Sequence, residues 1–142
     1  MKLTGSCVCG AVRFELIREP VWSHYCHCSR CRKITGAASA ANLFVPSDGL
    51  RFLQGEQHAR SFRLPDTRHF RHVFCQRCGS NLPFVDAALG LVVVPMGSLD
   101  DDHPKLAPRA HMFVGSKAPW HPINDSLPRH PDAGRWELDP ED

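Results

Sequence analysis

Seven cysteines fall into short groups whose spacing is typical of metal ligands. Two form C-x-C, three form C-x-C-x-x-C and two form C-x-x-C; they are Cys7, Cys9, Cys26, Cys28, Cys31, Cys75 and Cys78. Thiolate sulfur is a good zinc ligand, whereas an odd number of cysteines leaves one thiol over in any complete set of disulfides. The spacing therefore indicates metal binding rather than disulfide bonding.

Seven ligands divide naturally into a closed set and an open one, because structural zinc takes four protein ligands and catalytic zinc usually takes three. Gly10 follows the first pair and Gly79 follows the last, and glycine readily adopts the positive φ that such metal-binding turns often need. The sequence therefore predicts two zinc ions. The structural ion is held by Cys7, Cys9, Cys75 and Cys78, and the catalytic ion by Cys26, Cys28 and Cys31.

An open zinc ion on three thiolates favours thiol chemistry over hydrolysis. A substrate thiol in the fourth position loses its proton well below its free pKa of about 8.5. Three thiolates leave the ion with a net negative charge, which makes it a poor generator of hydroxide. Two alternatives stay open at this point. His24 or His27 supplies the fourth ligand of the second zinc ion, or the cysteines hold an iron–sulfur cluster, although the common cysteine spacings for such clusters differ from these.

The elements that position these cysteines are expected to be short strands, which predicts an all-β domain with metal-bound turns. Alternating apolar residues predict one strand around Val12–Leu16 and another around Phe70–Phe74, each adjoining a cysteine group. Further strands are expected at 40–45, 50–53, 61–64, 82–85, 89–96 and 111–114. Residues 28–36 are expected to form one or two helical turns. Seven of the twelve prolines follow residue 103, so the last third is expected to wrap the sheet as extended coil.

Length and composition fit one soluble domain. The chain has 142 residues, of which 42% are hydrophobic and 23% charged, which excludes a disordered protein and a membrane protein. The N-terminus has no apolar stretch typical of a secretory signal, so a cytoplasmic location is expected. Residues 1–123 are expected to form the zinc-binding domain and residues 124–142 an acidic tail. Trp136 is the large apolar side chain expected to anchor that tail.

Five motifs resemble the family of glutathione-dependent formaldehyde-activating enzymes, which includes the centromere protein V group. They are GSCVCGAVRF at 5–14, CHCSRCRK at 26–33, FCQRCGS at 74–80, GSLDD at 97–101 and HMFVGSKAPW at 111–120. The resemblance implies a β-rich Mss4-like fold with the same division into a structural and a catalytic zinc. It also implies a carbon–sulfur lyase that joins glutathione to formaldehyde, giving S-(hydroxymethyl)glutathione.

The expected substrate is thus a small thiol–aldehyde adduct. In its formation the thiol binds the open zinc, loses its proton and attacks the aldehyde carbon, and in the reverse direction the adduct is cleaved. Arg30, Arg32 and Lys33 are candidates to hold substrate carboxylates, although solvated charges are the simpler interpretation. The rival hypothesis is a non-catalytic two-zinc scaffold that binds a protein or nucleic-acid partner through basic residues at 60–77. Nucleic-acid binding is not favoured, because alternation places Phe62, Phe70 and Phe74 inward.

Three further features carry weaker signals. Ser98, Asp100 and Asp101 are expected to form an Asx-type turn at a strand end, with a carboxylate beside the open zinc as the alternative. Trp120 is expected to pack against the body or to line a cleft. His111 is expected to be a hydrogen-bonded sheet residue rather than a metal ligand. The sequence does not indicate an oligomeric state.

Overall fold

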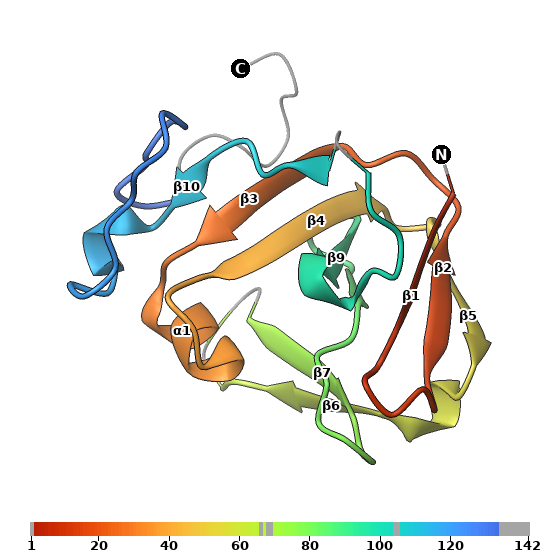
Figure 1. Cartoon of the computed structure of the whole chain (residues 1–142). Helices are drawn as coiled ribbons and strands as arrows, with labels where there is room; N and C mark the ends of the chain where they lie inside the picture. Colours follow the sequence, from red (N-terminus) through yellow and green to blue (C-terminus); the bar gives the residue numbers. More distant parts are fainter. Residues whose placement is uncertain (1, 66, 68–69, 104–105, 134–142) are drawn as a thin grey trace.

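The computed structural model describes residues 2–65, 67, 70–103 and 106–133, and within them the chain is built mainly of short strands (Figure 1). The β-rich class expected from the sequence is confirmed. The elements, in chain order, are β1 (Leu3–Ser6), β2 (Arg13–Leu16), β3 (Trp22–Cys26), α1 (Ser29–Thr35), β4 (Ala40–Pro46), β5 (Leu50–Gln54), η1 (Glu56–His58), β6 (Ala59–Arg63), β7 (Arg71–Cys75), β8 (Phe84–Asp86), β9 (Leu91–Pro95), η2 (Met96–Ser98), β10 (His111–Met112) and η4 (Val114–Ser116).

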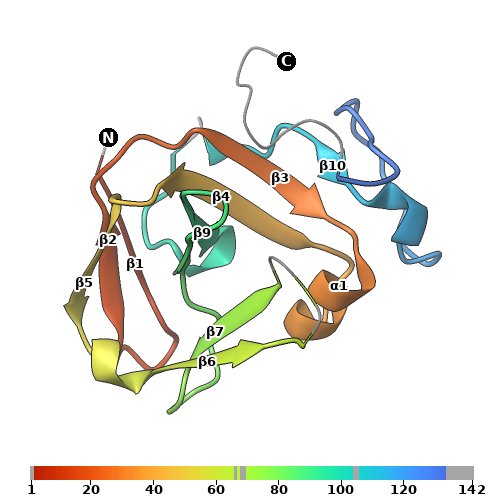
Figure 2. The ribbon, with the colours of Figure 1, turned by 180° about the vertical axis from the view of Figure 1, so that it is seen from behind.

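The strands form three sheets. One has the order β1-β2-β5, the second β10-β3-β4-β9-β8, and the third is the β6-β7 pair. All the pairings within them are antiparallel except that of β10 with β3. The reverse view shows α1 near one end of β7, on the opposite side of the molecule from β1 and β2 (Figure 2). The cysteines are therefore carried by strand ends and turns that belong to different sheets.

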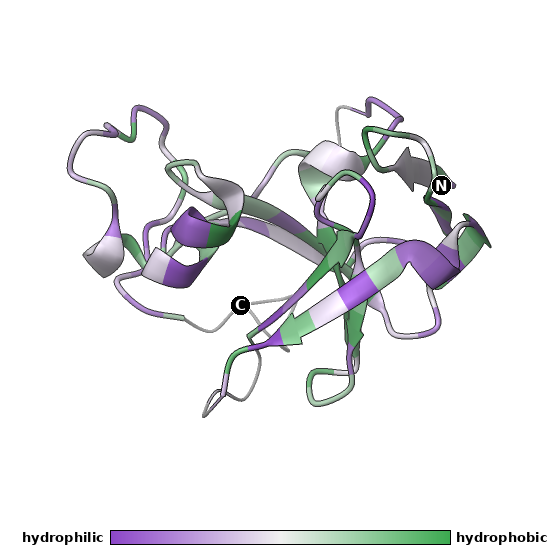
Figure 3. Ribbon diagram, turned by 90° about the horizontal axis from the view of Figure 1, so that it is seen from below, coloured by the Kyte–Doolittle hydropathy of each residue, from purple (hydrophilic) through white to green (hydrophobic). Residues whose placement is uncertain are grey.

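The main hydrophobic core lies between the first two sheets. Phe14 and Leu16 from β2 pack with residues of β4 and β9, among them Leu43 and Val92, and all four are almost fully buried. A second cluster surrounds the four-cysteine region and includes Val12, Val73 and Leu82. Hydrophilic residues are frequent in the connecting segments (Figure 3).

Two strands were not predicted. In β3 the buried positions include Ser23 and His24, so the segment lacks the apolar alternation by which a strand is recognised. The four residues of β1 include only one large apolar side chain, Leu3. Tertiary pairing fixes both segments, β1 against β2 and β3 between β10 and β4.

The expected orientation of two strands was wrong. In β7 the buried side chains are Val73 and Cys75, while Phe74 is only partly buried. Phe62 in β6 is about half exposed, at 49%. The thiol ligand Cys75 must point toward its partners, and because side chains alternate along a strand, this fixes Phe74 on the opposite face.

Glu15 also departs from the expected alternation, because it is buried among charged partners. Its carboxylate accepts a hydrogen bond from Arg51 Nε at 2.6 Å and pairs with Lys2 Nζ at 3.0 Å. The hydrogen bond from Lys2, followed by that from Arg51, holds the pKa of Glu15 below its ordinary value of 4.5.

Acidification is expected to destabilise the native chain more than the Glu15→Gln variant. A carboxyl whose pKa is lowered in the folded state stabilises the fold above its unfolded pKa, and this contribution disappears as the pH falls through the folded pKa. At pH 7 the melting temperature of the variant is expected to be a few degrees below that of the native chain. This difference in melting temperature is expected to narrow below about pH 4.5. Melting curves of both proteins from pH 7 to pH 3 measure it; a constant gap would contradict the assignment.

The C-terminal segment up to residue 133 packs against β10, the edge strand next to β3. The backbone N–H of His111 donates to the carbonyl of Pro128, and that of His130 donates to the carbonyl of His111. Residues 124–133 thus contact the body of the domain, while Trp136 lies outside the described residues and the boundary at residue 123 stays a prediction. Within the described ranges, no helix is long and apolar enough to span a bilayer.

Candidate metal centres and the adjoining pocket

Two turns, each closed by a glycine at positive φ, present the first set of cysteines. After β1, the N–H of Gly10 donates to the carbonyl of Cys7 at 3.0 Å; after β7, the N–H of Gly79 donates to the carbonyl of Cys75 at 2.7 Å. Gly10 has φ 78° and Gly79 has φ 79°, which confirms the expectation drawn from their positions. Each glycine directly follows the second cysteine of its pair and takes a positive φ there, which residues with a side chain rarely adopt.

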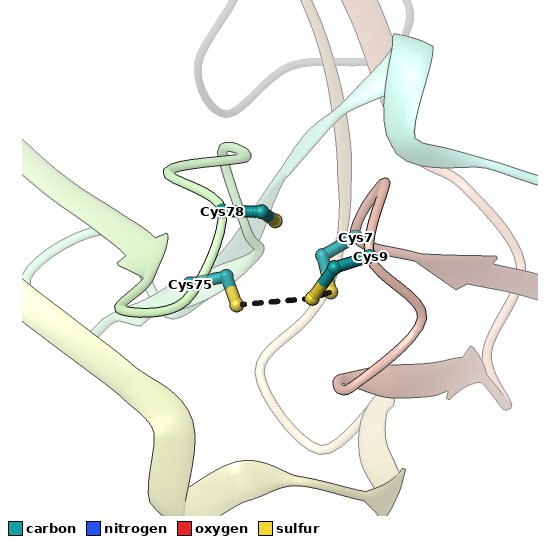
Figure 4. Close-up of side chains that lie close together, drawn as sticks. All are labelled: Cys7, Cys9, Cys75 and Cys78. Atoms are coloured by element: carbon teal, nitrogen blue, oxygen red, sulfur yellow. Dashed lines mark hydrogen bonds between the residues drawn. The ribbon is translucent and has the colours of Figure 1, made fainter.

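The two turns bring four sulfurs together, as Figure 4 shows for Cys7 and Cys9 on one side and Cys75 and Cys78 on the other. The Sγ atoms of Cys7 and Cys9 are 3.5 Å apart, and those of Cys9 and Cys75 are 4.0 Å apart. Four sulfurs bound about 2.3 Å from one zinc ion at tetrahedral corners lie about 3.8 Å apart. The observed separations bracket that value, so the arrangement fits a tetrahedral zinc.

Polar neighbours favour the thiolate form of two of these sulfurs, those of Cys7 and Cys78, whereas contact with Cys7 raises the pKa of Cys9 to about 11. The N–H of Val12 donates to Cys7 Sγ at 3.2 Å, and the hydroxyl of Ser80 lies 3.3 Å from Cys78 Sγ. The hydrogen bond with Ser80 is the largest cause that lowers the pKa of Cys78, to about 5. A lowered thiol pKa favours metal binding, because the thiolate is the ligand.

Replacing Gly79 with alanine is expected to destabilise the chain by about 1–2 kcal/mol, since a side chain at φ 79° is strained. A Cβ added there would meet no atom within 4 Å, so the cost comes from the backbone alone. Gly97 is the matched control, because its Cβ also meets nothing within 4 Å and its φ is not positive. Chemical denaturation measures both variants; equal effects would argue against strain at Gly79.

The second set of cysteines surrounds the start of α1. Cys26 ends β3, Cys28 caps the helix and accepts a hydrogen bond from the N–H of Cys31 at 3.4 Å, and Gly36 ends the helix in the left-handed conformation. The expected helical turns at 28–36 are therefore present. The three sulfurs lie within 4.8 Å of one another.

The proximity of these three sulfurs couples their ionisation. Hydrogen bonds from Cys26 and then Cys31 lower the pKa of Cys28 to about 2, while the same contact raises the pKa of Cys26 to about 12. Hydrogen bonds with Cys26 and Cys28 also raise the pKa of Cys31. Without a cation, the thiolate form is therefore favoured at Cys28 alone, which accepts hydrogen bonds from the protonated thiols of Cys26 and Cys31. Ionising all three requires a positive charge among them, which a divalent metal ion supplies.

Neither His24 nor His27 belongs to this cluster among the described residues. His24 Nδ1 accepts a hydrogen bond from the indole of Trp22 at 2.9 Å. His27 Nε2 is 2.8 Å from His111 Nδ1, and His111 Nε2 is 2.9 Å from a carboxylate oxygen of Asp125. His111 is therefore a hydrogen-bonded sheet residue, as expected.

A large pocket adjoins the three-cysteine cluster. Its volume is about 860 Å³, and Cys26 and Cys31 lie in its wall together with Cys7 of the other cluster. The rest of the wall comes mainly from α1, β4, β7, β8 and β9, and its larger side chains include Ile34, Phe44, Phe70, His72, Phe84, Leu89, Val93 and Phe113. Sequence reasoning did not indicate these residues, because they come together only through strand pairing.

Asp100 and Asp101 do not form the expected Asx turn. The Asp100 carboxylate accepts a hydrogen bond from the hydroxyl of Ser6 at 2.8 Å, and Asp101 accepts one from the hydroxyl of Thr4 at 3.0 Å. Both carboxylates therefore hold β1 in the position from which Cys7 enters its cluster. Asp100 also lies in the wall of the pocket.

The expectations for Trp120 and for the basic residues of α1 have different outcomes. Trp120 is 68% exposed and lines no described pocket wall, so its expected packing was wrong. Arg30 and Lys33 are exposed, as solvated charges would be. The guanidinium of Arg30 lies 6.0 Å from the ring centre of Phe70, which places it at the rim of the pocket.

A family model described as glutathione-dependent formaldehyde-activating enzyme matches residues 2–116. The chain belongs to this family. A relative from Halomonas elongata, whose name places it among glutathione-dependent formaldehyde-activating enzymes, is 35% identical over 130 residues, covering 84% of this chain and 80% of its own. Both cysteine clusters lie inside the region that matches the family model, so the resemblance noted in the sequence is confirmed.

A solved structure supports the same fold. The crystal structure of a Rhodobacter sphaeroides protein superimposes with a TM-score of 0.59 at 23% identity, covering 72% of this chain and 92% of that one. At this level of identity the similarity concerns the fold alone. It shows that this family member shares its β-rich arrangement with a protein of distant sequence.

Proposed function

We propose that the chain is a zinc-dependent carbon–sulfur lyase that forms and cleaves the adduct of glutathione and formaldehyde. The observation that carries the proposal is the difference between the two clusters. Cys7, Cys9, Cys75 and Cys78 supply a full set of four ligands, while Cys26, Cys28 and Cys31 supply only three. Two of these three, Cys26 and Cys31, lie in the wall of a pocket of about 860 Å³, which Cys7 alone of the four-sulfur set reaches. Four ligands suit a structural ion and three suit a catalytic one.

The three cysteines and two polar residues of the pocket wall have distinct roles in the proposed reaction. When bound by the three thiolates, a zinc ion supplies a Lewis acid that makes a nearby thiol acidic. Strand register places His24 beside Asn42 and Cys26 beside Ala40, so two polar side chains lie in the pocket wall next to the cluster. They are positioned to hydrogen-bond the aldehyde oxygen. The step joins the thiol sulfur to the aldehyde carbon and transfers the thiol proton to the oxygen; cleavage reverses both changes.

Glutathione carboxylates are assigned to the rim rather than to the interior of the pocket. Arg30 and Lys33 follow the ligand loop on α1 and are exposed, and Arg30 contacts Phe70 of the pocket wall. Guanidinium and ammonium groups bind carboxylates by charge-assisted hydrogen bonds. A cytoplasmic location stays a prediction that agrees with this chemistry, since reduced thiols are needed on both enzyme and substrate.

Exchange spectroscopy tests the proposal, because thiols and aldehydes also combine without a catalyst. Two-dimensional NMR measures the exchange of formaldehyde between its free and glutathione-bound forms, with the zinc-loaded chain, the zinc-depleted chain and buffer alone. We expect at least a tenfold faster exchange with the zinc-loaded chain. An exchange rate equal to that in buffer would favour the non-catalytic scaffold. In such a scaffold, added thiol is also expected to bind neither zinc ion.

A further inference from the structure

We propose that the site takes aldehydes with an extended apolar body in preference to formaldehyde. The inference rests on the proposed function, since it names the aldehyde partner of the same reaction. Formaldehyde has a single carbon, whereas the pocket has the volume usual for drug-sized ligands. Most of that space is therefore available to a larger group attached to the carbonyl carbon.

A row of apolar side chains crosses the sheet in the wall of this pocket. Val93 on β9 pairs with Phe44 on β4 and with Phe84 on β8. All three residues line the pocket. Directly paired residues on neighbouring strands have their side chains side by side, so the row forms one continuous apolar surface.

The row lies at a definite distance from the three-cysteine cluster. Ala40 pairs with Cys26, and Ala40, Asn42 and Phe44 follow one another on the same face of β4. At roughly 3.3 Å per residue, Phe44 is about 13 Å along the strand from Ala40. An aldehyde held at the cluster must therefore carry a chain of several carbons, or an aromatic group, to reach the row.

The charge of the wall argues against an anionic occupant of the pocket interior. In the described part of the wall, Arg71 is the one lysine or arginine, against Asp86 and Asp100. The guanidinium of Arg71 is already engaged, because it lies 5.9 Å from the ring centre of Phe84 and its Nε donates to Ser61. Glutathione has two carboxylates, so the interior suits these anionic ends poorly, whereas the row of Phe44, Val93 and Phe84 suits an apolar group.

A series of straight-chain aldehydes tests the inference, because ethanal, butanal and hexanal have similar carbonyl reactivity and differ in apolar length. With glutathione as the common thiol and the uncatalysed rate subtracted, we expect kcat/KM to rise about fourfold per added methylene. Hexanal is expected to surpass formaldehyde. A flat or falling series, with formaldehyde turned over normally, would overturn the inference and leave the proposed function standing.

Two valines on the β8–β9 hairpin provide a matched pair of variants. Val93→Thr places a hydroxyl in the apolar row without changing the size of the side chain, and is expected to lower kcat/KM for hexanal about tenfold while changing ethanal less than twofold. Val85 pairs with Val92, is 38% exposed and does not line the pocket. Val85→Thr is expected to leave kcat/KM unchanged for both hexanal and ethanal. An equal fall in kcat/KM for hexanal in both variants would contradict the assignment of the apolar row to the aldehyde chain.

Binding of 1-butanol and 1-hexanol, followed by NMR, gives a readout that does not depend on turnover. We expect hexanol to bind about sixteenfold more tightly than butanol to the wild-type chain, and this difference to shrink in Val93→Thr. Equal binding of the two alcohols would overturn the apolar subsite. If no aldehyde, formaldehyde included, is turned over faster than in buffer, the proposed function itself fails and the substrate assignment fails with it.

Discussion

The Cys28→Ser variant is expected to lose one of two bound zinc ions and to form the adduct no faster than buffer alone, while it stays folded. Cys28 caps α1, and its sulfur contacts those of both Cys26 and Cys31. A serine hydroxyl still caps a helix, but it replaces the thiolate poorly as a zinc ligand. Loss of the Lewis acid removes several kcal/mol of transition-state stabilisation.

Metal analysis, circular dichroism and the exchange assay together measure this result. Ser29→Ala is the matched control, because Ser29 is the next residue in the chain and is exposed on the first turn of the same helix. It is expected to retain both ions and full activity. Loss of both ions from Cys28→Ser, or of neither, would show that the three-cysteine set is not an independent site.

The Cys75→Ser variant is expected to unfold rather than merely to lose activity. Cys75 is fully buried, and its cluster joins the β1–β2 turn to the end of β7. Binding of a structural zinc contributes about 10–16 kcal/mol in small zinc domains. This is comparable to the whole stability of a typical domain, which is about 5–15 kcal/mol. Weakening this ion is therefore expected to remove most of the free energy that keeps the chain folded.

Arg77→Ser is the control for that experiment, since Arg77 lies in the same turn between Cys75 and Cys78 and is exposed. It is expected to melt within about 2 °C of the wild type. A strong chelator is expected to reproduce the unfolding of Cys75→Ser in the wild-type chain. A cooperative melt that Cys75→Ser shares with the wild type would contradict a structural role for the four-cysteine cluster.

Local chemistry explains what could be predicted from the sequence. The grouping of the cysteines follows from their spacing and from the glycines after each turn, and both clusters come together in the structure as expected. The helical turns after Cys28 are similarly local, since a capping sulfur and a C-terminal glycine mark their ends. Such signals lie within a few residues and need no knowledge of the tertiary structure.

Long-range contacts explain what could not be predicted. The pocket wall depends on the register that pairs Val93 with both Phe44 and Phe84, and no local pattern encodes that register. Ser6 and Asp100 are 94 residues apart, so their hydrogen bond has no local sign. In β7, the need to aim Cys75 at its cluster outweighed the apolar alternation of Phe70, His72 and Phe74.

The two clusters also differ in when they can exist during synthesis of the chain. The sulfurs of Cys26, Cys28 and Cys31 leave the ribosome almost together, so this set can capture an ion while most of the sheet is still unmade. The contact between Cys9 and Cys75 spans 66 residues, and the first pair must wait as free thiols until β7 has emerged. An ion bound by the four-cysteine set can therefore be acquired only after Cys78 has emerged, and until then the thiols of Cys7 and Cys9 stay free only in a reducing environment.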